Sequence, residues 1–170
     1  MSGNGHRLIA FTLGQCPDHK GRDIEDVWRL SHFWLEHTHD IIQWLFPIPE
    51  AGRFNGFAPL LDAEAQAAFA ESDELRARQR QSLDVMLDFF GLAREPDGIV
   101  ALPHLNPRDH IWLKRGGHNH LRISRMIRSL HLCHQPELAR AFQAAVIGIG
   151  TQQGFVSAQS VDYWRAANQP

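Results

Sequence analysis

Residues 23–61 read DIEDVWRLSHFWLEHTHDIIQWLFPIPEAGRFNGFAPLL, and this stretch decides the predicted fold. At about 100° per residue, the apolar side chains of residues 24–46 form two neighbouring stripes. A helix that is apolar over most of its circumference must be covered by other parts of the chain. The pattern therefore predicts one long central helix over residues 23–46. Its single polar ribbon consists of Glu25, Arg29, His32, Glu36, Asp40 and Gln43.

The segment after this helix is predicted to be an ordered loop over residues 47–61. Pro47 ends the helix because proline lacks the N–H group that a helix interior needs. Prolines and glycines then alternate with Ile48, Phe54 and Phe57, so the loop has apolar side chains with which to pack itself down. Upstream, residues 1–22 contain one short apolar piece without a partner strand, which favours a lid over the core.

Downstream, capping signals and periodicity predict further helices. Asp62 caps a short Ala-rich helix, and Ser72 opens a longer one that ends at Phe90. Residues 91–106 are predicted as a loop, a short helix follows, and longer helices cover residues 118–133 and the segment after Pro136. No repeat and no alternating strand pattern is present. We predict an all-α, single-domain bundle of about seven helices over residues 1–170.

Composition places limits on function. The net charge of −2 is unlike that of a general polyanion-binding protein. Residues 18–74 carry twelve acids and four bases, whereas residues 108–140 carry seven bases and two acids. Either the two parts attract each other, or the basic part holds an anion. Two cysteines, no signal peptide and no transmembrane segment predict a cytoplasmic protein in a reducing compartment.

Chemical motifs are few. The eleven histidines lack a matched set of ligands at helical spacing, so no metal or other cofactor is expected. No catalytic motif is recognisable, and the chain is expected not to be an enzyme. One alternative is a small hydrolase-like enzyme that uses Asp40 and His120 as an acid and base pair. A second alternative is nucleic-acid binding through the helix of Arg122, Arg125 and Arg128. The excess of acids over residues 18–74 disfavours it, because it would repel phosphate.

Two segments of the sequence carry a family resemblance. They are HDIIQWLFPIPEAGRFNGFAPLL, residues 39–61, and NHLRISRMIRSL, residues 119–130. Together they closely resemble the conserved amino-terminal domain of the opioid growth factor receptor family. Ile41 stands where the family usually has Tyr, and Ser124 where it usually has Thr. The length of 170 residues leads us to expect a short, stand-alone member of the bacterial or fungal type.

This resemblance implies a helical domain with receptor activity toward an opioid peptide of the enkephalin type. It also allows peripheral membrane association, and it leaves the natural ligand and the oligomeric state open. A peptide or small molecule with an ammonium and a carboxylate would suit acids that lie beside arginines. The alternative is that the same groups form an internal network that fixes the fold. The predicted ligand-binding set is Asp40, Gln43, Trp44, Glu50, Asn55, Asn119, His120, Arg122 and Arg125.

Overall fold

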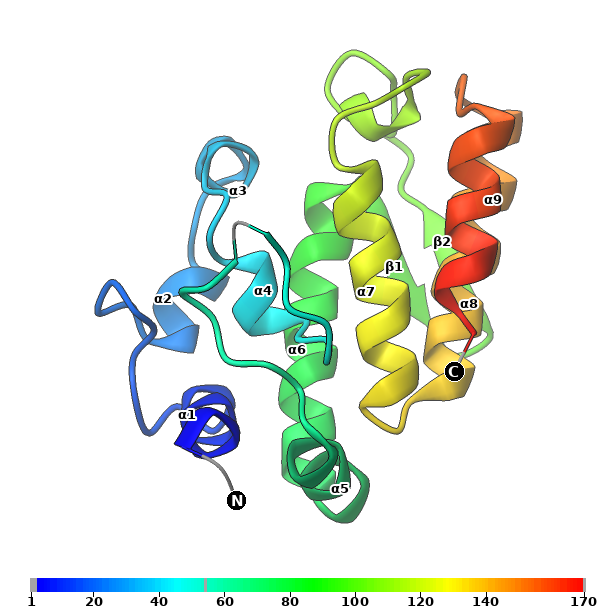
Figure 1. Cartoon of the computed structure of the whole chain (residues 1–170). Coiled ribbons are helices and arrows are strands. Elements are labelled where there is room, and N and C mark those ends of the chain that lie inside the picture. Colours follow the sequence, from blue (N-terminus) through cyan, green and yellow to red (C-terminus); the bar gives the residue numbers. More distant parts are fainter. Residues whose placement is uncertain (1–2, 54, 170) are drawn as a thin grey trace. The chain divides into compact units, whose positions relative to one another are not determined.

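The computed structural model describes residues 3–53 and 55–169, and 57% of these described residues are helical. The predicted helical class is therefore confirmed. The elements, shown in Figure 1, are α1 (Gly3–Thr12), α2 (Ile24–Trp28), α3 (His32–His37), α4 (Ile42–Leu45), α5 (Ala63–Glu71), α6 (Asp73–Phe89), β1 (Leu92–Glu95), β2 (Gly98–Ala101), the 3-10 helix η1 (Ile111–Leu113), α7 (His120–Leu132), α8 (Pro136–Gln152) and α9 (Ala158–Ala167).

The prediction of one long helix over residues 23–46 is wrong. The structure has three short helices there, α2, α3 and α4, which Figure 1 shows as separate coils. Ser31 accounts for the second start, because its side chain accepts a hydrogen bond from the Trp34 N–H at 3.3 Å and so acts as an N-cap. The next break lies at Thr38, whose backbone is extended at φ −102° and ψ 110°, and α4 begins only at Ile42.

The chain divides into two compact units. The first unit comprises the described residues up to Ser82 together with Leu132–His134, and the second comprises Leu83–His131 and the described residues from Gln135 onward. In the first unit, α1 packs against α5 and α4. One buried cluster there consists of Leu8, Leu61, Ala65, Phe69, Leu75 and Cys133. The piece predicted as a lid is thus part of a helix with a buried face.

Arg78 on α6 joins several elements of the first unit. Its guanidinium donates to the backbone carbonyl of Thr12 and pairs with Glu25 at 2.7 Å. It also lies over the ring of Trp28 at 5.1 Å from the centroid, and the Trp28 indole N–H donates to Ser82 at 2.8 Å. These contacts attach α2 and the end of α1 to the first half of α6. The loop over residues 47–61 contains neither helix nor strand among its described positions, and Phe54 lies outside them.

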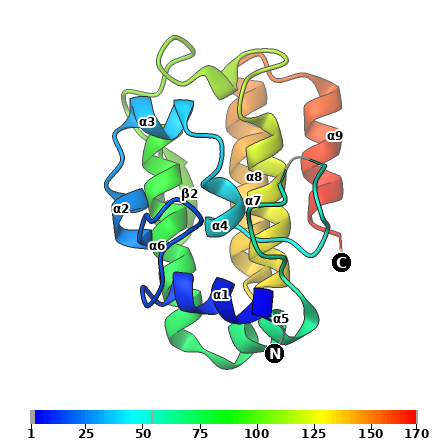
Figure 2. The same cartoon turned by 60° about the vertical axis from the view of Figure 1, so that its left-hand side comes forward.

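The second unit contains α7, α8, α9 and a β-hairpin. Figure 2 shows α8 and α9 side by side, and β2 packs against α8. The hairpin pairs Leu92 with Ala101 and Glu95 with Gly98, where the sequence analysis predicted an irregular loop. The strictly all-α prediction is therefore corrected to a helical fold with one two-stranded sheet in the described part of the chain. The Pro96-Asp97-Gly98 sequence is a turn signal between two short strands that the helical reading overlooked.

Most other helix boundaries agree with the sequence prediction. Asp62 caps α5 by accepting a hydrogen bond from the Ala65 N–H at 2.8 Å, and Ser72 does the same for α6 at Leu75. Pro136 is the first residue of α8, where its missing N–H costs nothing. These local signals were sufficient to predict where the helices begin, because each cap satisfies backbone groups within three residues of itself.

Candidate functional site

A histidine, an aspartate and a tryptophan form the centre of a polar network in the first unit. Trp44 on α4 is buried, and its indole N–H donates to Nδ1 of His19 at 3.1 Å. An indole nitrogen can only donate, so Nδ1 of His19 must accept. The other ring nitrogen, Nε2, lies 3.0 Å from Oδ2 of Asp40 and donates to that carboxylate. The two neighbours thus fix one neutral tautomer of the imidazole.

Asp40 also binds two cationic side chains. Lys20 Nζ lies 3.1 Å from Oδ2, and Arg22 Nη2 lies 3.1 Å from Oδ1. Burial raises the pKa of Asp40, but the hydrogen bonds and positive charges of Lys20 and Arg22 outweigh burial and lower its pKa below 3.8. Asp40 is therefore ionised at neutral pH. Exposed fractions are 17% for the Asp40 side chain and 63% for Lys20, so the lysine is the part of this ion pair that meets solvent.

The turn over residues 18–22 is held by Asp18. Its Oδ1 accepts from the backbone N–H groups of Lys20 and Arg22, each at 2.9 Å, and its Oδ2 pairs with Nε of Arg22 at 2.7 Å. Gly21 has φ +79°, a conformation that a glycine adopts without strain. Asp18 therefore acts within its own turn, and it positions both cations beside Asp40.

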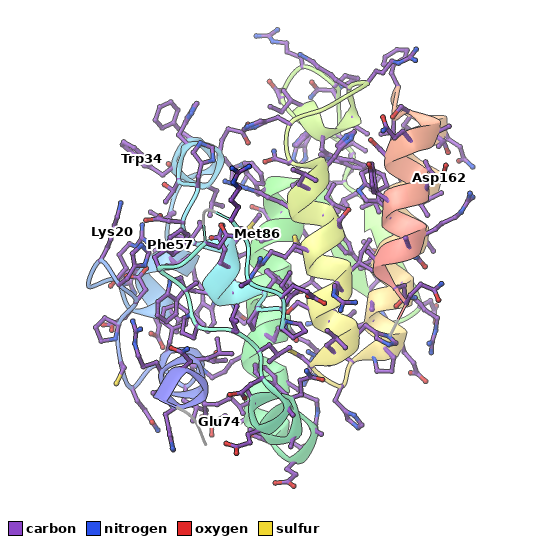
Figure 3. All side chains as sticks on the ribbon, in the orientation of Figure 1. Lys20, Trp34, Phe57, Glu74, Met86 and Asp162 are labelled. Atoms are coloured by element: carbon purple, nitrogen blue, oxygen red, sulfur yellow. The ribbon has the colours of Figure 1, made fainter. Side chains whose placement is uncertain are left out.

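Aromatic side chains border the network. The ring of Phe57, in the loop after α4, stacks on His19 with centroids 4.6 Å apart. Behind them, Trp44 packs against Phe11 at 4.9 Å, and Arg7 lies over the Trp44 ring at 5.3 Å. Figure 3 labels Lys20 and Phe57, which lie on the same side of this unit. The network therefore combines an acid, cations and a half-buried aromatic face.

Two more residues of the predicted ligand-binding set, Gln43 and Asn55, contact each other in the first unit. The side-chain amide of Gln43 donates to the His39 carbonyl at 3.2 Å and to Asn55 Oδ1 at 3.4 Å. Glu50 is exposed on the same loop as Asn55. The structure thus joins Gln43 to Asn55 and Trp44 to Asp40 through His19. We refer to Asp18, His19, Lys20, Arg22, Asp40, Trp44 and Phe57 as the His19 network.

The remaining predicted residues belong to the second unit. Asn119 precedes α7 with φ +81°, a backbone conformation that asparagine tolerates better than most residues. Arg122 is buried, and Arg125 is half-buried on the same helix. Whether these residues join the Asp40 group, as the sequence analysis proposed, stays a prediction, because the two groups belong to different units.

His120 has a different environment from His19. Its Nε2 donates to the Trp112 carbonyl at 2.6 Å, and its Nδ1 accepts from the Ser160 hydroxyl at 2.7 Å. Burial lowers the pKa of His120 below 6.5, although the hydrogen bond to the Trp112 carbonyl opposes that shift. Both nitrogens are thus engaged inside the second unit. Asp40 and His120 each have partners from their own unit, so these contacts do not supply the proposed acid and base pair.

Sequence reasoning missed most of the His19 network. Phe57 was placed only in the predicted loop, and no role was predicted for Asp18, His19, Lys20 and Arg22 in the segment before residue 23. Nothing in the spacing of these residues identifies a partner about twenty residues away. One signal was available. Asp18 followed by Gly21 is typical of a turn closed by an aspartate side chain, and such a turn orients the residues within it.

The described residues contain no group of three or more His, Cys, Asp or Glu side chains able to hold a metal ion. Over residues 3–53 and 55–169, no helix combines the length and the apolar character needed to cross a membrane.

Fold and network together define a mostly helical protein with a polar, partly exposed aromatic and ionic site in its first unit. Residues 13–169 match the family described as "Opioid growth factor receptor (OGFr) conserved region". The chain belongs to this opioid growth factor receptor family, which confirms the resemblance seen in the sequence.

Similar proteins include the opioid growth factor receptor of Rattus norvegicus, which is 37% identical over 121 residues, 68% of this chain and 20% of the relative. The opioid growth factor receptor-like protein 1 of Xenopus tropicalis is 35% identical over 128 residues, covering 72% of this chain and 25% of the relative. The chain thus spans about a fifth to a quarter of the length of these relatives. No solved structure matches it.

Proposed function

We propose that this chain is a non-enzymatic binding domain for a short peptide with free termini, of the enkephalin type, and that the His19 network is its contact site. Relatives named as opioid growth factor receptors support the receptor class. The observation that carries the proposal is the partly exposed Asp40 carboxylate between the exposed ammonium of Lys20 and the largely buried guanidinium of Arg22.

A zwitterionic peptide can exchange its charges with those of the network. Its carboxylate would replace Asp40 as the partner of Lys20, and its ammonium would occupy the place that Lys20 leaves beside Asp40. Because each new ion pair replaces an existing one, the net electrostatic gain is small. Affinity must then come partly from apolar contact, and the half-buried ring of Phe57 beside His19 offers a surface for an aromatic side chain.

Gln43 and Asn55 complete the proposed site with amide groups next to the loop of Glu50. Amides can hydrogen-bond a peptide backbone as donors or acceptors, which a site for an extended peptide requires. We also propose a cytoplasmic location, because Cys16 and Cys133 are thiols and not a disulfide, and a reducing compartment keeps thiols in that form.

Isothermal titration with methionine-enkephalin tests this function. The free peptide is compared with its C-terminal amide, and each is titrated into the unmodified chain and Lys20→Met. We expect amidation and Lys20→Met each to weaken binding by about three- to tenfold, the size of a partly exposed charge pair with hydrogen bonding. Once Lys20 is replaced, amidation should have little further effect, because the two changes remove the same pair.

Lys114→Met is the matched control, since Lys114 is an exposed lysine of the second unit and the side-chain change is identical. It should bind both peptides as the unmodified chain does. Equal affinities for Lys20→Met, Lys114→Met and the unmodified chain would contradict the proposed contact site. Absence of saturable heat with every peptide form would contradict the peptide-binding function itself.

A further inference from the structure

A cation that has no acidic partner lies beside the His19 network. Arg7 on α1 places its guanidinium carbon 5.3 Å from the centroid of the Trp44 ring, and Arg7 is exposed. Among the described residues its side chain makes no ion pair, whereas Lys20 and Arg22 both pair with Asp40. Arg7 is therefore a positive charge at the edge of the network that no carboxylate in the described part of the chain neutralises.

The helix α1 holds Arg7 over Trp44. Arg7 and Phe11 are four residues apart, so they project from the same face of this helix. Phe11 is buried and packs on Trp44 with ring centroids 4.9 Å apart, which turns that face toward α4. A guanidinium that lies over an aromatic ring is held through its own flat face, and its N–H groups still point outward from its edge. Arg7 is thus partly ordered before an anion reaches it, which lowers the entropic cost of pairing.

The Trp44 ring connects Arg7 to the proposed peptide site. The rings of Trp44 and His19 are parallel to within 2°, and their centroids are 5.9 Å apart. Arg7 Cζ therefore lies no farther than about 11 Å from the His19 ring, which is the span of about three residues of an extended peptide. Phe57 stacks on His19. A peptide with an aromatic side chain on Phe57 can thus bring a residue no more than about three positions away to Arg7.

We infer that Arg7 is a specificity-determining residue of the proposed site, and that the ligand is an acidic peptide whose Asp or Glu side chain pairs with Arg7. The inference rests on the proposed peptide-binding function and narrows its ligand class. A carboxylate can accept two parallel hydrogen bonds from a guanidinium, whereas a basic side chain would meet a like charge there. Because Lys20 is the proposed partner of the terminal carboxylate, the second anion must come from a side chain of the peptide.

Isothermal titration with charged and neutral variants of methionine-enkephalin tests the inference. Each of the two inner glycines of the peptide is replaced in turn by aspartate or by asparagine, which has nearly the same size and no charge. At one or both positions, we expect the aspartate peptide to bind about three- to tenfold more tightly than the asparagine peptide. This ratio of affinities should decrease at high salt, because salt screens an exposed ion pair.

Two negative outcomes are distinct. Equal affinities of the aspartate and asparagine peptides at both positions, together with saturable binding of methionine-enkephalin itself, would overturn the inference and leave the proposed function intact. Absence of saturable heat with every peptide would contradict the proposed function, and the inference with it.

Arg7→Met tests which residue causes the preference for the acidic peptide. Methionine keeps an unbranched side chain over Trp44 and removes the charge, so the ratio of affinities for the aspartate and asparagine peptides should fall to about one. A general loss of affinity would affect both peptides alike and would not change this ratio. Arg165→Met is the matched control, because Arg165 is an exposed arginine on α9 of the second unit. It should keep the ratio of the unmodified chain. A ratio that Arg7→Met leaves unchanged, or that both substitutions lower equally, would overturn the role of Arg7.

Nuclear magnetic resonance locates the contact on the side chain itself. The Nε–H resonance of Arg7 is assigned in the isotopically labelled full chain by its absence from the spectrum of Arg7→Met. We expect it to shift saturably with the aspartate peptide, with the dissociation constant that the heats give, and to shift less with the asparagine peptide. Shifts of equal size with both peptides, or no shift with either, would overturn the assigned ion pair.

Discussion

The two units each pack a histidine against tryptophan, but the two histidines have opposite surroundings. His19 touches a carboxylate, a buried indole and a half-buried phenylalanine, and its side chain is 19% exposed. His120 touches a hydroxyl and a backbone carbonyl and packs edge-on to Trp164 at 5.0 Å. The first arrangement has charges that a ligand can reach and exchange. The second is neutral and saturated, which is typical of a group that fixes the fold.

The largest effect on stability is expected from His120→Ala. The substitution leaves the Trp112 carbonyl and the Ser160 hydroxyl without their partner and opens space beside Trp164. We expect a loss of about 3 kcal/mol in the free energy of unfolding, from the cavity and the unsatisfied groups together. Urea denaturation followed by far-UV circular dichroism measures it.

His118→Ala is the control for that experiment, because His118 is exposed two residues away. It should change the free energy of unfolding by less than about 0.5 kcal/mol. Similar losses for both substitutions would mean that His120 contributes no more than a surface histidine, and the contrast between the two units would fail.

Asp40→Asn should have the next largest effect. The neutral amide of asparagine cannot balance the positive charges of Lys20 and Arg22. Its NH2 group takes the place of one carboxylate oxygen and can only donate, so it faces a donor where the oxygen accepted. We expect a loss of about 1.5 kcal/mol, the usual size for hydrogen bonds to a charged group. Asp26→Asn is the control, since Asp26 makes an exposed pair with Arg29 and the asparagine carbonyl can still accept the capping bond from the Asp23 N–H, so the loss should be less than about 0.5 kcal/mol. A loss for Asp40→Asn no larger than the control would contradict the His19 network as a structural unit.

Lowering the pH should reduce the free energy of unfolding in one range through His120 and in a lower range through Asp40. Each reduction should be smaller than the loss caused by His120→Ala or Asp40→Asn. Burial keeps the pKa of His120 below its ordinary 6.5, so the unfolded chain takes up a proton first as the pH falls. Stability contributed by neutral His120 is therefore full above pH 6.5 and is lost as the pH falls toward its folded pKa. For Asp40, whose pKa is lowered below 3.8, the corresponding loss begins only near that value and continues downward.

Urea midpoints measured across this range give the test. His120→Gln should flatten the dependence just below pH 6.5, and Asp40→Asn should flatten the dependence below about pH 4. If His120→Gln left the upper range unchanged, protonation of His120 would not be coupled to folding. If His120→Gln flattened the dependence only below about pH 4, or Asp40→Asn only just below pH 6.5, the assignment of each group to its environment would be contradicted.

The same contrast shows what could be predicted from sequence. Caps such as Asp62, Ser72 and Pro136 act within one helical turn, and they placed α5, α6 and α8 correctly. The prediction for residues 23–46 was wrong because the apolar periodicity there is continuous, whereas the helix is interrupted by the Ser31 cap and by the extended backbone at Thr38. The apolar periodicity of a sequence indicates which side chains are buried, but it does not indicate where a polar side chain finds a partner.

For the candidate site, the motif residues Asp40 and Trp44 were identified, but the residue that joins them was not. His19 lies 21 residues before Asp40 and 25 before Trp44, so no helical or strand spacing relates the three. Their approach depends on the turn that Asp18 closes and on the packing of α1 against α4. Such long-range placement follows from tertiary packing, which a single sequence does not display.

The smallest expected effect on stability separates binding from folding within the His19 network. Lys20→Met removes a charge whose side chain is 63% exposed, and Asp40 keeps its contacts with Arg22 and His19. The free energy of unfolding should therefore change by less than about 0.5 kcal/mol, as for other exposed ion pairs. The peptide affinity should nevertheless fall in the titration described above, because Lys20 is the proposed partner of the ligand carboxylate. A stability loss as large as that of Asp40→Asn would instead show that Lys20 belongs to the folding network, and the distinction between a reachable and a saturated histidine site would lose its main support.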